Sequence, residues 1–231
     1  SMWGKSYRNF PSCASEISNF ERWATENNLT LNRMKSAEIV FVSSRRRRDL
    51  VLPPSVVNFE SVEQLKALGV TITRKLSVSP HVDELLAACA KTLFALRTLR
   101  QHGLPTGAIQ DIFQATVVAK LSYASPAWHG FMNAADSARL EAFLRRSARL
   151  GFRSFSAPTF ASLCAEANDR LFSNILKDSR HLLQPLLPPT RDEHYNLRKR
   201  AHNRQLPVRT SSINDNGFLI RMLYKNVLNS V

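Results

Sequence analysis

Residues 120–130 read KLSYASPAWHG, and a helical pattern runs into this stretch from the N-terminal side. The pattern repeats every three or four positions, the period of one helix face, at Ile109, Ile112, Phe113, Thr116, Val117 and Leu121. Because Pro126 disfavours helical geometry at the residue before it, we expect this helix to end near Ser125. Trp128 follows, and its indole N–H needs a hydrogen-bond partner if the ring is buried. The stretch is therefore predicted to be a buried aromatic corner.

A second helical pattern leaves this corner at Ser137–Leu150, with Asn133 or Asp136 available to cap it and Gly151 to end it. Its inward face is predicted to carry Leu140, Phe143 and Leu144. Three cations, Arg145, Arg146 and Arg149, project within about 100° of one another on the other face, at 100° per residue. The helical period thus places these three side chains together as one cationic stripe.

The charge of the chain is its strongest global signal. The 231 residues carry a net charge of +14, and the sequence pI is about 10.4, which favours nucleic acid or an anionic membrane as partner. Basic residues outnumber acidic ones by 12 to 7 in residues 1–75, by 9 to 5 in residues 76–155 and by 11 to 6 in residues 156–231. An excess spread in this way suits a long polyanion, RNA or DNA, although it is also compatible with a soluble cationic protein.

No membrane or secretory signal is evident. No stretch approaches the ~20 apolar residues of a membrane span, and Ser1–Phe10 lacks the apolar core of a signal peptide. Cys13, Cys89 and Cys164 are too far apart for a cysteine-rich zinc site or a disulfide framework, so we expect reduced, mostly buried thiols. The expected location is intracellular, in the cytoplasm or the nucleus, without a membrane partner.

The predicted fold class is α+β, mostly α. A helix over Ser12–Asn28 and three short strands, around Ala37–Val42, Val56–Phe59 and Leu65–Ile72, predict a small antiparallel sheet with one helix. From Ser79 onward helices dominate, and 44% hydrophobic content is enough for a real core. The later helices are expected over Ser79–Gly103, from about Ile109 to near Ser125, and over Ser137–Leu150, Phe160–Ala167, Asp169–Leu183 and Phe218–Tyr224.

Two further cation runs are candidate phosphate contacts. The first consists of Arg45, Arg46, Arg47 and Arg48, and a solvated loop is the alternative for it. The second consists of Arg198, Lys199 and Arg200, close to Tyr195. No carboxylate pair has the placement of a two-metal site. His181, His194, His202 and Cys164 match no common zinc motif. We therefore expect no metal and no cofactor in this chain.

A set of short segments, in this order, resembles the reverse transcriptases of LINE-type (non-LTR) retrotransposons of the jockey-like kind. In the first half of the chain the segments are Trp23-Ala24, Asn27-Asn28-Leu29, Leu31-Asn32, Lys35, Leu65-Lys66, residues 68–72, Leu76, His81-Val82 and residues 123–128. In the second half they are Leu140-Glu141, Arg145-Arg146, His181, Leu187-Pro188, Leu197-Arg198, Arg200, His202, Leu206-Pro207 and residues 218–224. Each segment alone is weak evidence for the family, and their occurrence in this order is strong evidence for the resemblance.

The resemblance implies that residues 1–78 are the end of a polymerase palm, residues 79–155 a helical thumb and residues 156–231 a C-terminal extension. Because a thumb follows the backbone of the product hybrid, the resemblance also implies that Arg145, Arg146 and Arg149 contact phosphate groups. Leu68, Gly69 and Val70 would then form the primer grip, although an ordinary strand with a glycine is compatible with the same residues. Lys35 would correspond to a palm lysine that acts as general acid toward the leaving pyrophosphate, with a plain surface lysine as the alternative. Trp128 and Tyr123 are interpreted as core residues.

One departure from the family concerns the metal site. The family's Tyr-x-Asp-Asp hairpin, which holds two Mg²⁺ ions, should lie just before Cys13, but Ser1–Pro11 contains no Asp. We therefore expect this chain alone to be inactive as an RNA-directed DNA polymerase, with Mg²⁺ bound only in a full-length parent. The favoured interpretation is a truncated reverse transcriptase that binds an RNA–DNA primer–template. The alternatives are a co-opted nucleic-acid or protein interaction module and a helical domain whose charge is incidental.

Overall fold

The computed structural model describes residues 10–41, 59–191, 202–209 and 212–225. The chain divides into two compact units, which we name the N-terminal unit (residues 1–67 and 72–75) and the helical unit (residues 68–71 and 76–231). Strands occur only before residue 74 among the named elements, and helices dominate after it. The expected fold class, α+β and mostly α, is confirmed.

The N-terminal unit contains α1 (Phe10–Glu26), η1 (Arg33–Lys35), β1 (Ala37–Glu38) and β2 (Glu60–Ser61). Helix α1 confirms the helix expected over Ser12–Asn28. Strands β1 and β2 pair in parallel, with Ala37 opposite Glu60, whereas antiparallel pairing was expected. A parallel pair needs a connection of a dozen or more residues, and residues 39–59 supply one. Val56 and Val57, which were expected in a strand, lie outside the described residues.

Strands β3 (Gln64–Ala67) and β4 (Val70–Thr73) form a two-stranded sheet where one strand over Leu65–Ile72 was expected. That expectation was wrong because the chain reverses at Leu68 and Gly69, which have φ angles of +48° and +83°. Two successive positive φ angles are what a two-residue hairpin turn requires. Leu68–Thr71, which comprises this turn and the first two residues of β4, belongs to the helical unit.

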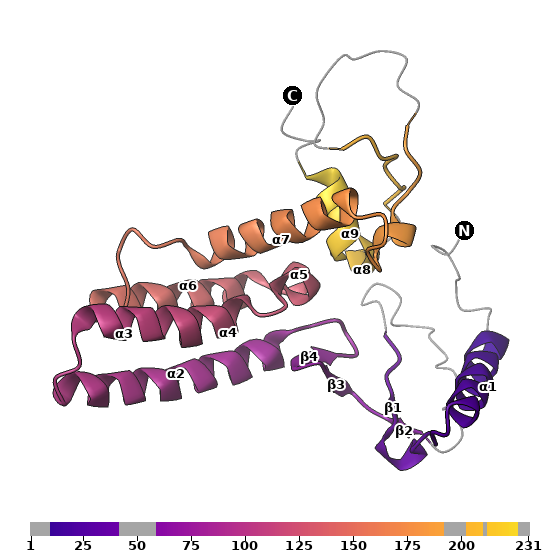
Figure 1. The fold of residues 1–231 in the computed structure, drawn as a ribbon, viewed down its shortest axis with the longest axis horizontal. Coiled ribbons are helices and arrows are strands. Elements are labelled where there is room, and N and C mark those ends of the chain that lie inside the picture. The colour runs from indigo at the N-terminus through magenta and orange to yellow at the C-terminus, as the bar shows by residue number, and fades with distance from the viewer. Residues whose placement is uncertain (1–9, 42–58, 192–201, 210–211, 226–231) are drawn as a thin grey trace. The chain divides into compact units, whose positions relative to one another are not determined.

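The helical unit is a bundle of α-helices. Figure 1 shows α2, α3 with α4, α6 and α7 lying side by side. The main elements are α2 (Ser79–Gln101), α3 (Thr106–Phe113), the π-helical turn η3 (Gln114–Val118), α4 (Ala119–Ser122), α5 (Ser125–Trp128), η4 (His129–Phe131), α6 (Ala134–Arg149) and α7 (Phe160–Lys177). The chain closes with η5 (Gln184–Leu186), α8 (Ser212–Asp215) and α9 (Phe218–Tyr224). The closing helix expected over Phe218–Tyr224 is confirmed.

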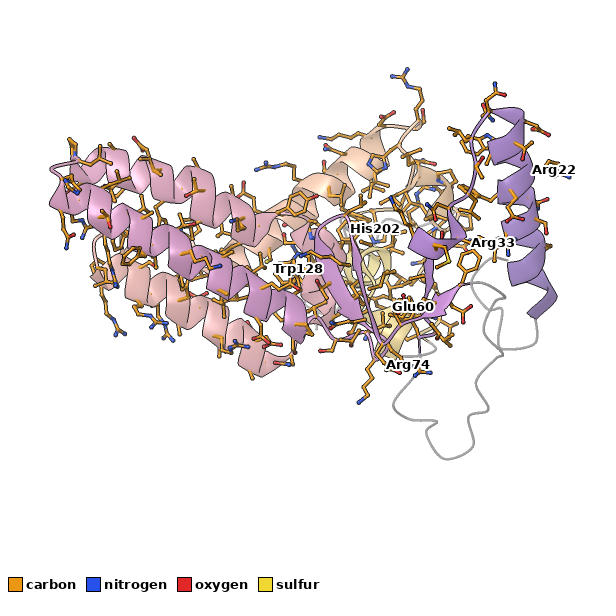
Figure 2. The ribbon with its side chains drawn as sticks, turned by 90° about the horizontal axis from the view of Figure 1, so that it is seen from below. Arg22, Arg33, Glu60, Arg74, Trp128 and His202 are labelled. Carbon is orange, nitrogen blue, oxygen red and sulfur yellow. The ribbon has the colours of Figure 1, made fainter. Side chains whose placement is uncertain are left out.

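The aromatic corner lies in the core of this bundle, where Trp128 is fully buried among the helices (Figure 2). Its indole Nε1 donates to the Tyr123 carbonyl oxygen at 3.0 Å, so the expected hydrogen-bond partner is present. The ring stacks on Phe160, with centroids 6.0 Å apart, and meets the His81 ring edge-on at 5.1 Å. The preceding helix ends at Ser122, slightly before Ser125, because Ala124 takes a left-handed φ of +50° and Ser125 starts α5.

Helix α7 is continuous, so the break expected between Ala167 and Asp169 was wrong. Asn168 and Asp169 favour helix caps when considered locally, but the apolar face continues past them and Asn168 itself is buried. The last turns of α7 pack with α9 in a second apolar cluster, made of Phe172, Ile175, Leu187, Leu219, Met222 and Leu223. Tertiary packing of this cluster outweighs the local preference.

Two cysteines lie in the bundle as free thiols. Cys89 on α2 and Cys164 on α7 are both fully buried, as expected from the sequence. Burial raises the pKa of the Cys89 thiol to about 11, and nearby Lys120 opposes part of that shift. Burial also raises the pKa of Cys164 to about 11. Both thiols are therefore protonated at neutral pH.

Candidate nucleic-acid interface

Helix α6 carries the three arginines that the helical period predicts on one face. It begins where the Asn133 side chain accepts a hydrogen bond from the Asp136 amide at 2.7 Å, and it ends before Gly151, whose φ is +75°. Leu140, Phe143 and Leu144 are buried, as expected. Arg145, Arg146 and Arg149 are all exposed on the other side.

The three guanidinium groups have no acidic partner among the described residues. None of them forms a hydrogen bond or an ion pair with any residue that the structure describes. Arg139 on the same helix differs, because it pairs with Asp83 at 2.6 Å and with Asp136 at 3.1 Å. The last turn of a helix favours cations through its dipole, which is a local reason for Arg146 and Arg149. The dipole does not remove the positive charge from the surface, so the stripe remains available to an anion.

Helix α6 is fixed to α2 at both of its ends. At the N-terminal end, the Ser79 hydroxyl donates to Asp136 at 2.5 Å and accepts from the Asn133 amide nitrogen at 3.1 Å. At the C-terminal end, Arg100 donates to the Leu150 carbonyl oxygen at 2.7 Å, and its guanidinium lies 4.1 Å from the centre of the Phe152 ring. The arginine stripe therefore lies on a helix that is held in place at both ends.

The predicted primer grip forms the tip of the β3–β4 hairpin. Leu68 is 91% exposed, whereas Val70 is buried. The Tyr123 hydroxyl donates to the Leu68 carbonyl oxygen at 3.3 Å, and Gly69 lies against the Tyr123 ring. Tyr123 is 57% exposed, so the interpretation of Tyr123 as a core residue was wrong. A left-handed leucine costs about 1–2 kcal/mol, and strain of this kind is often found at functional sites.

Lys35, the predicted general acid, ends the short turn η1 in the N-terminal unit. Its backbone amide donates to the Asn32 side chain at 3.2 Å, and its own side chain is exposed. Nothing in this setting requires a catalytic role, and the role stays a prediction. Arg45, Arg46, Arg47 and Arg48, and likewise Arg198, Lys199 and Arg200, lie outside the described residues.

The described histidines, cysteines and carboxylates form no group of three or more that could hold a metal ion. Both ring nitrogens of His202 already have hydrogen-bond partners within the protein. Its Nε2 bonds the Leu223 carbonyl oxygen at 2.9 Å, and its Nδ1 accepts from the Arg204 amide at 3.1 Å. Its ring also meets Phe172 edge-on, with the centroids 5.7 Å apart. Within the ranges that the structure describes, no helix has the length and apolarity to cross a membrane.

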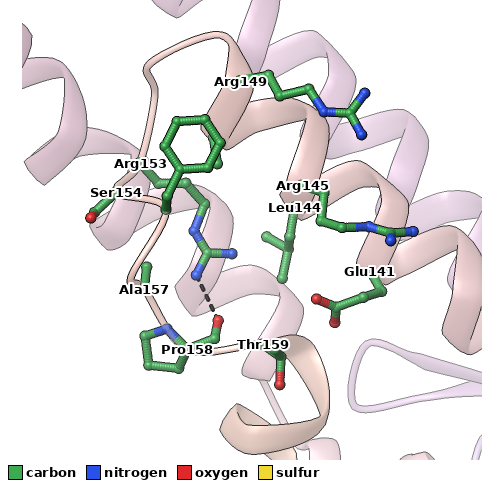
Figure 3. A pocket seen from close by; sticks show the side chains of 11 residues that line it. Glu141, Leu144, Arg145, Arg149, Arg153, Ser154, Ala157, Pro158 and Thr159 are labelled. Carbon is green, nitrogen blue, oxygen red and sulfur yellow. Dashed lines mark hydrogen bonds between the residues drawn. The ribbon is translucent and has the colours of Figure 1, made fainter.

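A hollow beside the stripe contains two residues that the sequence reasoning missed, Arg153 and Phe155. It has a volume of about 270 Å³ and lies between α6 and the loop of residues 150–159 (Figure 3). Arg145, Arg149 and Arg153 recur at every fourth position, and that spacing was the available signal for Arg153.

Comparisons of the chain with protein-family models, curated proteins and solved structures find no match.

Proposed function

We propose that this chain is the thumb-bearing part of an RNA-directed DNA polymerase similar to LINE-type reverse transcriptases, and that α6 binds the backbone of an RNA–DNA primer–template. The observation that carries the proposal is the stripe of Arg145, Arg146 and Arg149, which is exposed and has no acidic partner among the described residues. The resemblance of the ordered sequence segments supplies the polymerase context.

The chemistry of the stripe suits phosphate groups. A guanidinium offers a planar fork of donors that matches phosphate oxygens, and it keeps its charge at any physiological pH. Phosphate contacts fix the register of a protein on a duplex without reading its sequence. Binding through α6 should therefore be strong at low salt and nearly independent of sequence.

The test compares wild-type protein with the triple variant Arg145→Ala, Arg146→Ala, Arg149→Ala on a fluorescent RNA–DNA hybrid across a salt series. Loss of up to three phosphate contacts should flatten the dependence of log K on log salt by about 2–3 units. The matched control is the triple variant Lys91→Ala, Arg97→Ala, Lys120→Ala. It also removes three positive charges, but from exposed positions on α2 and α4.

An unchanged slope in the α6 variant would place the nucleic-acid surface elsewhere. Equal flattening in both variants would mean that net charge, not the stripe, determines binding. A preference for single strands over the hybrid, with the α6 effect retained, would support the co-opted interaction module instead of a polymerase thumb.

A further inference from the structure

The hollow beside α6 combines an apolar floor with cations at its rim. Leu144 and Ala148, both buried, line it from α6, and Phe155, Ala157 and Pro158 line it from the loop. Figure 3 shows Arg145 and Arg149 extending from α6 on the same side, while the Arg153 guanidinium points to the Pro158 carbonyl oxygen. Such a surface suits a ligand that is flat and apolar in one part and anionic in another.

Phe155 is the exposed aromatic residue of this hollow, and hydrogen bonds between its two neighbours order the loop that carries it. The ring is 80% exposed, although Phe152 and Phe160 at the two ends of the loop are buried. The Ser154 and Ser156 hydroxyls are 2.8 Å apart on either side of it, and the Ser156 amide donates to Ser154 at 3.2 Å. An aromatic ring displayed on a braced loop forms a stacking surface that needs little ordering when a ligand binds.

Arg153 fixes the base of the loop and is not itself the anion site. It is buried, and it donates to the Pro158 carbonyl oxygen at 2.6 Å. Burial lowers the pKa of Arg153, and the nearby Glu141 carboxylate opposes that shift. Glu141 in turn accepts a hydrogen bond from the Phe160 amide at 2.8 Å, which occupies the start of α7. The charges left for a ligand are those of Arg145 and Arg149.

We infer that this hollow binds one unpaired nucleotide of a single strand, with its base against Phe155 and its phosphates at Arg145 and Arg149. The inference rests on the proposed function, because the same arginines would hold the strand that continues from the hybrid. Successive bases stack on exposed aromatic side chains in many single-strand-binding proteins, beside a cationic track for the backbone. With a volume of about 270 Å³, the hollow has room for a nucleotide base.

An acidic peptide is the competing ligand, and two features count against it. The floor and the Phe155 ring match a flat base better than a flexible carboxylate side chain. Glu141 also lines the hollow, and its carboxylate can accept a hydrogen bond from a base amino group, which an ionised acidic side chain cannot donate.

The experiment uses the full chain and two probes, a blunt RNA–DNA hybrid and the same hybrid with a single-stranded overhang containing 2-aminopurine. Wild-type protein should bind the overhang probe more tightly than the blunt one and should quench the 2-aminopurine fluorescence on stacking. Phe155→Ala should weaken overhang binding by about 5- to 100-fold, the effect of losing one stacked base. Its affinity for the blunt hybrid and its salt slope should stay unchanged, because no charge is removed.

Two control variants keep the inference falsifiable. Phe155→Trp should retain the overhang preference and the quenching, and Phe94→Ala, which removes an exposed ring from α2, should leave both unchanged. Thermal melts of all variants should coincide within the small shifts typical of surface substitutions.

Retention of the overhang preference and the quenching in Phe155→Ala would overturn the inference. Displacement of the overhang by a glutamate-rich peptide, with Phe155→Ala weakening the peptide equally, would also overturn it. If the triple arginine variant keeps the wild-type salt slope on the blunt hybrid but weakens binding of the overhang probe, and quenching still depends on Phe155, the proposed function fails and the nucleotide site stands.

Discussion

At the scale of single residues, Trp128 combines complete burial with one polar group that must be paired. Its Nε1 donates to the Tyr123 carbonyl oxygen at 3.0 Å, and its ring touches Phe160 and His81. Phe160 begins α7 and His81 lies in the first turn of α2. One side chain thus connects the corner of the bundle to both of these helices.

We expect Trp128→Phe to destabilise the protein. The Tyr123 carbonyl oxygen would lose its partner, which costs about 1–3 kcal/mol in a buried site, and the smaller ring would leave a cavity beside Phe160. Urea denaturation followed by circular dichroism measures the change. The control is Trp23→Phe on α1, where the ring is half exposed and the change should stay under ~0.5 kcal/mol. Equal effects of the two substitutions would contradict the central role of Trp128.

His129 makes stability depend on pH. Burial lowers the pKa of His129, and the Arg221 charge lowers it further. Arg221 donates to His129 Nδ1 at 3.3 Å, so the neutral ring is the form that fits. Below the ordinary pKa of histidine, about 6.5, the unfolded chain binds a proton that the folded chain does not. The free energy of unfolding should therefore fall as the pH drops from 7.5 toward 5.

The test is His129→Gln, which keeps an acceptor for Arg221 and removes the titration. Its loss of stability between pH 7.5 and pH 5 should be smaller than that of wild-type protein, measured by denaturant unfolding at each pH. His102→Gln, at an exposed position after α2, should leave the wild-type pH dependence unaltered. A variant of His129 with the full wild-type pH dependence would assign it to other groups.

At the scale of elements, the close contact between η4 and the segment before α9 depends on a glycine. A methyl group on Gly130 would overlap the Asn216 carbonyl oxygen and the Arg221 Nε atom. Arg221 also donates to the carbonyl oxygens of Asn216 and Pro126, at 3.0 and 3.1 Å. A side chain at position 130 would displace the whole junction.

Gly130→Ala should therefore destabilise the protein by about 1–3 kcal/mol, the usual cost of forcing extra atoms into a packed site. Gly107→Ala is the matched control, because it lies in α3 with nothing within 4 Å of the added methyl group. That variant should be neutral or more stable by roughly 0.5–1 kcal/mol, since alanine is the better helix former. Thermal melts should show a lower melting temperature for Gly130→Ala and an unchanged or higher one for Gly107→Ala, and equal shifts would argue against the contact at Gly130.

The elements with a long apolar period could be predicted from the sequence, and those set by local geometry could not. Helices α2, α6 and α9 follow their buried faces, and the cap at Asn133 follows from its side chain. The turn at Leu68–Gly69 was missed because leucine rarely takes a positive φ angle. The π-helical turn η3 was missed because the apolar period alone does not distinguish it from an α-helix.

The candidate site divides in the same way. The helical period placed Arg145, Arg146 and Arg149 together, since it depends only on their spacing. Their lack of acidic partners within the described part of the chain is a tertiary property and could not be predicted. The hydrogen bond from Arg100 to the Leu150 carbonyl oxygen joins residues far apart in the sequence, so no local pattern indicates it. Phe155 was missed because its exposure depends on how the loop is braced.

At the scale of the whole molecule, the core is unevenly distributed between the two units. Among the residues that the structure describes, Ala24 is the one buried hydrophobic residue of the N-terminal unit. All the others lie in the helical unit. A domain of this size needs a substantial apolar core to offset its conformational entropy.

We therefore expect residues 68–231 to fold alone and residues 1–75 not to fold cooperatively. The longer fragment should show the helical circular dichroism spectrum and a single melting transition close to that of the full chain. The shorter fragment should show no cooperative transition. A sharp melt of residues 1–75, or a loss of helicity in residues 68–231, would contradict this distribution of stability.

Alkylation of the two buried thiols would report how often the bundle opens. Cys89 and Cys164 are fully buried on α2 and α7, and protonated thiols react slowly with alkylating reagents. In a Cys13→Ser background, each labelling event would record a moment at which one of these helices separates from its neighbours. Mass spectrometry of the labelled peptides would then rank α2 against α7 by how often each is exposed, using cysteines that the chain already contains.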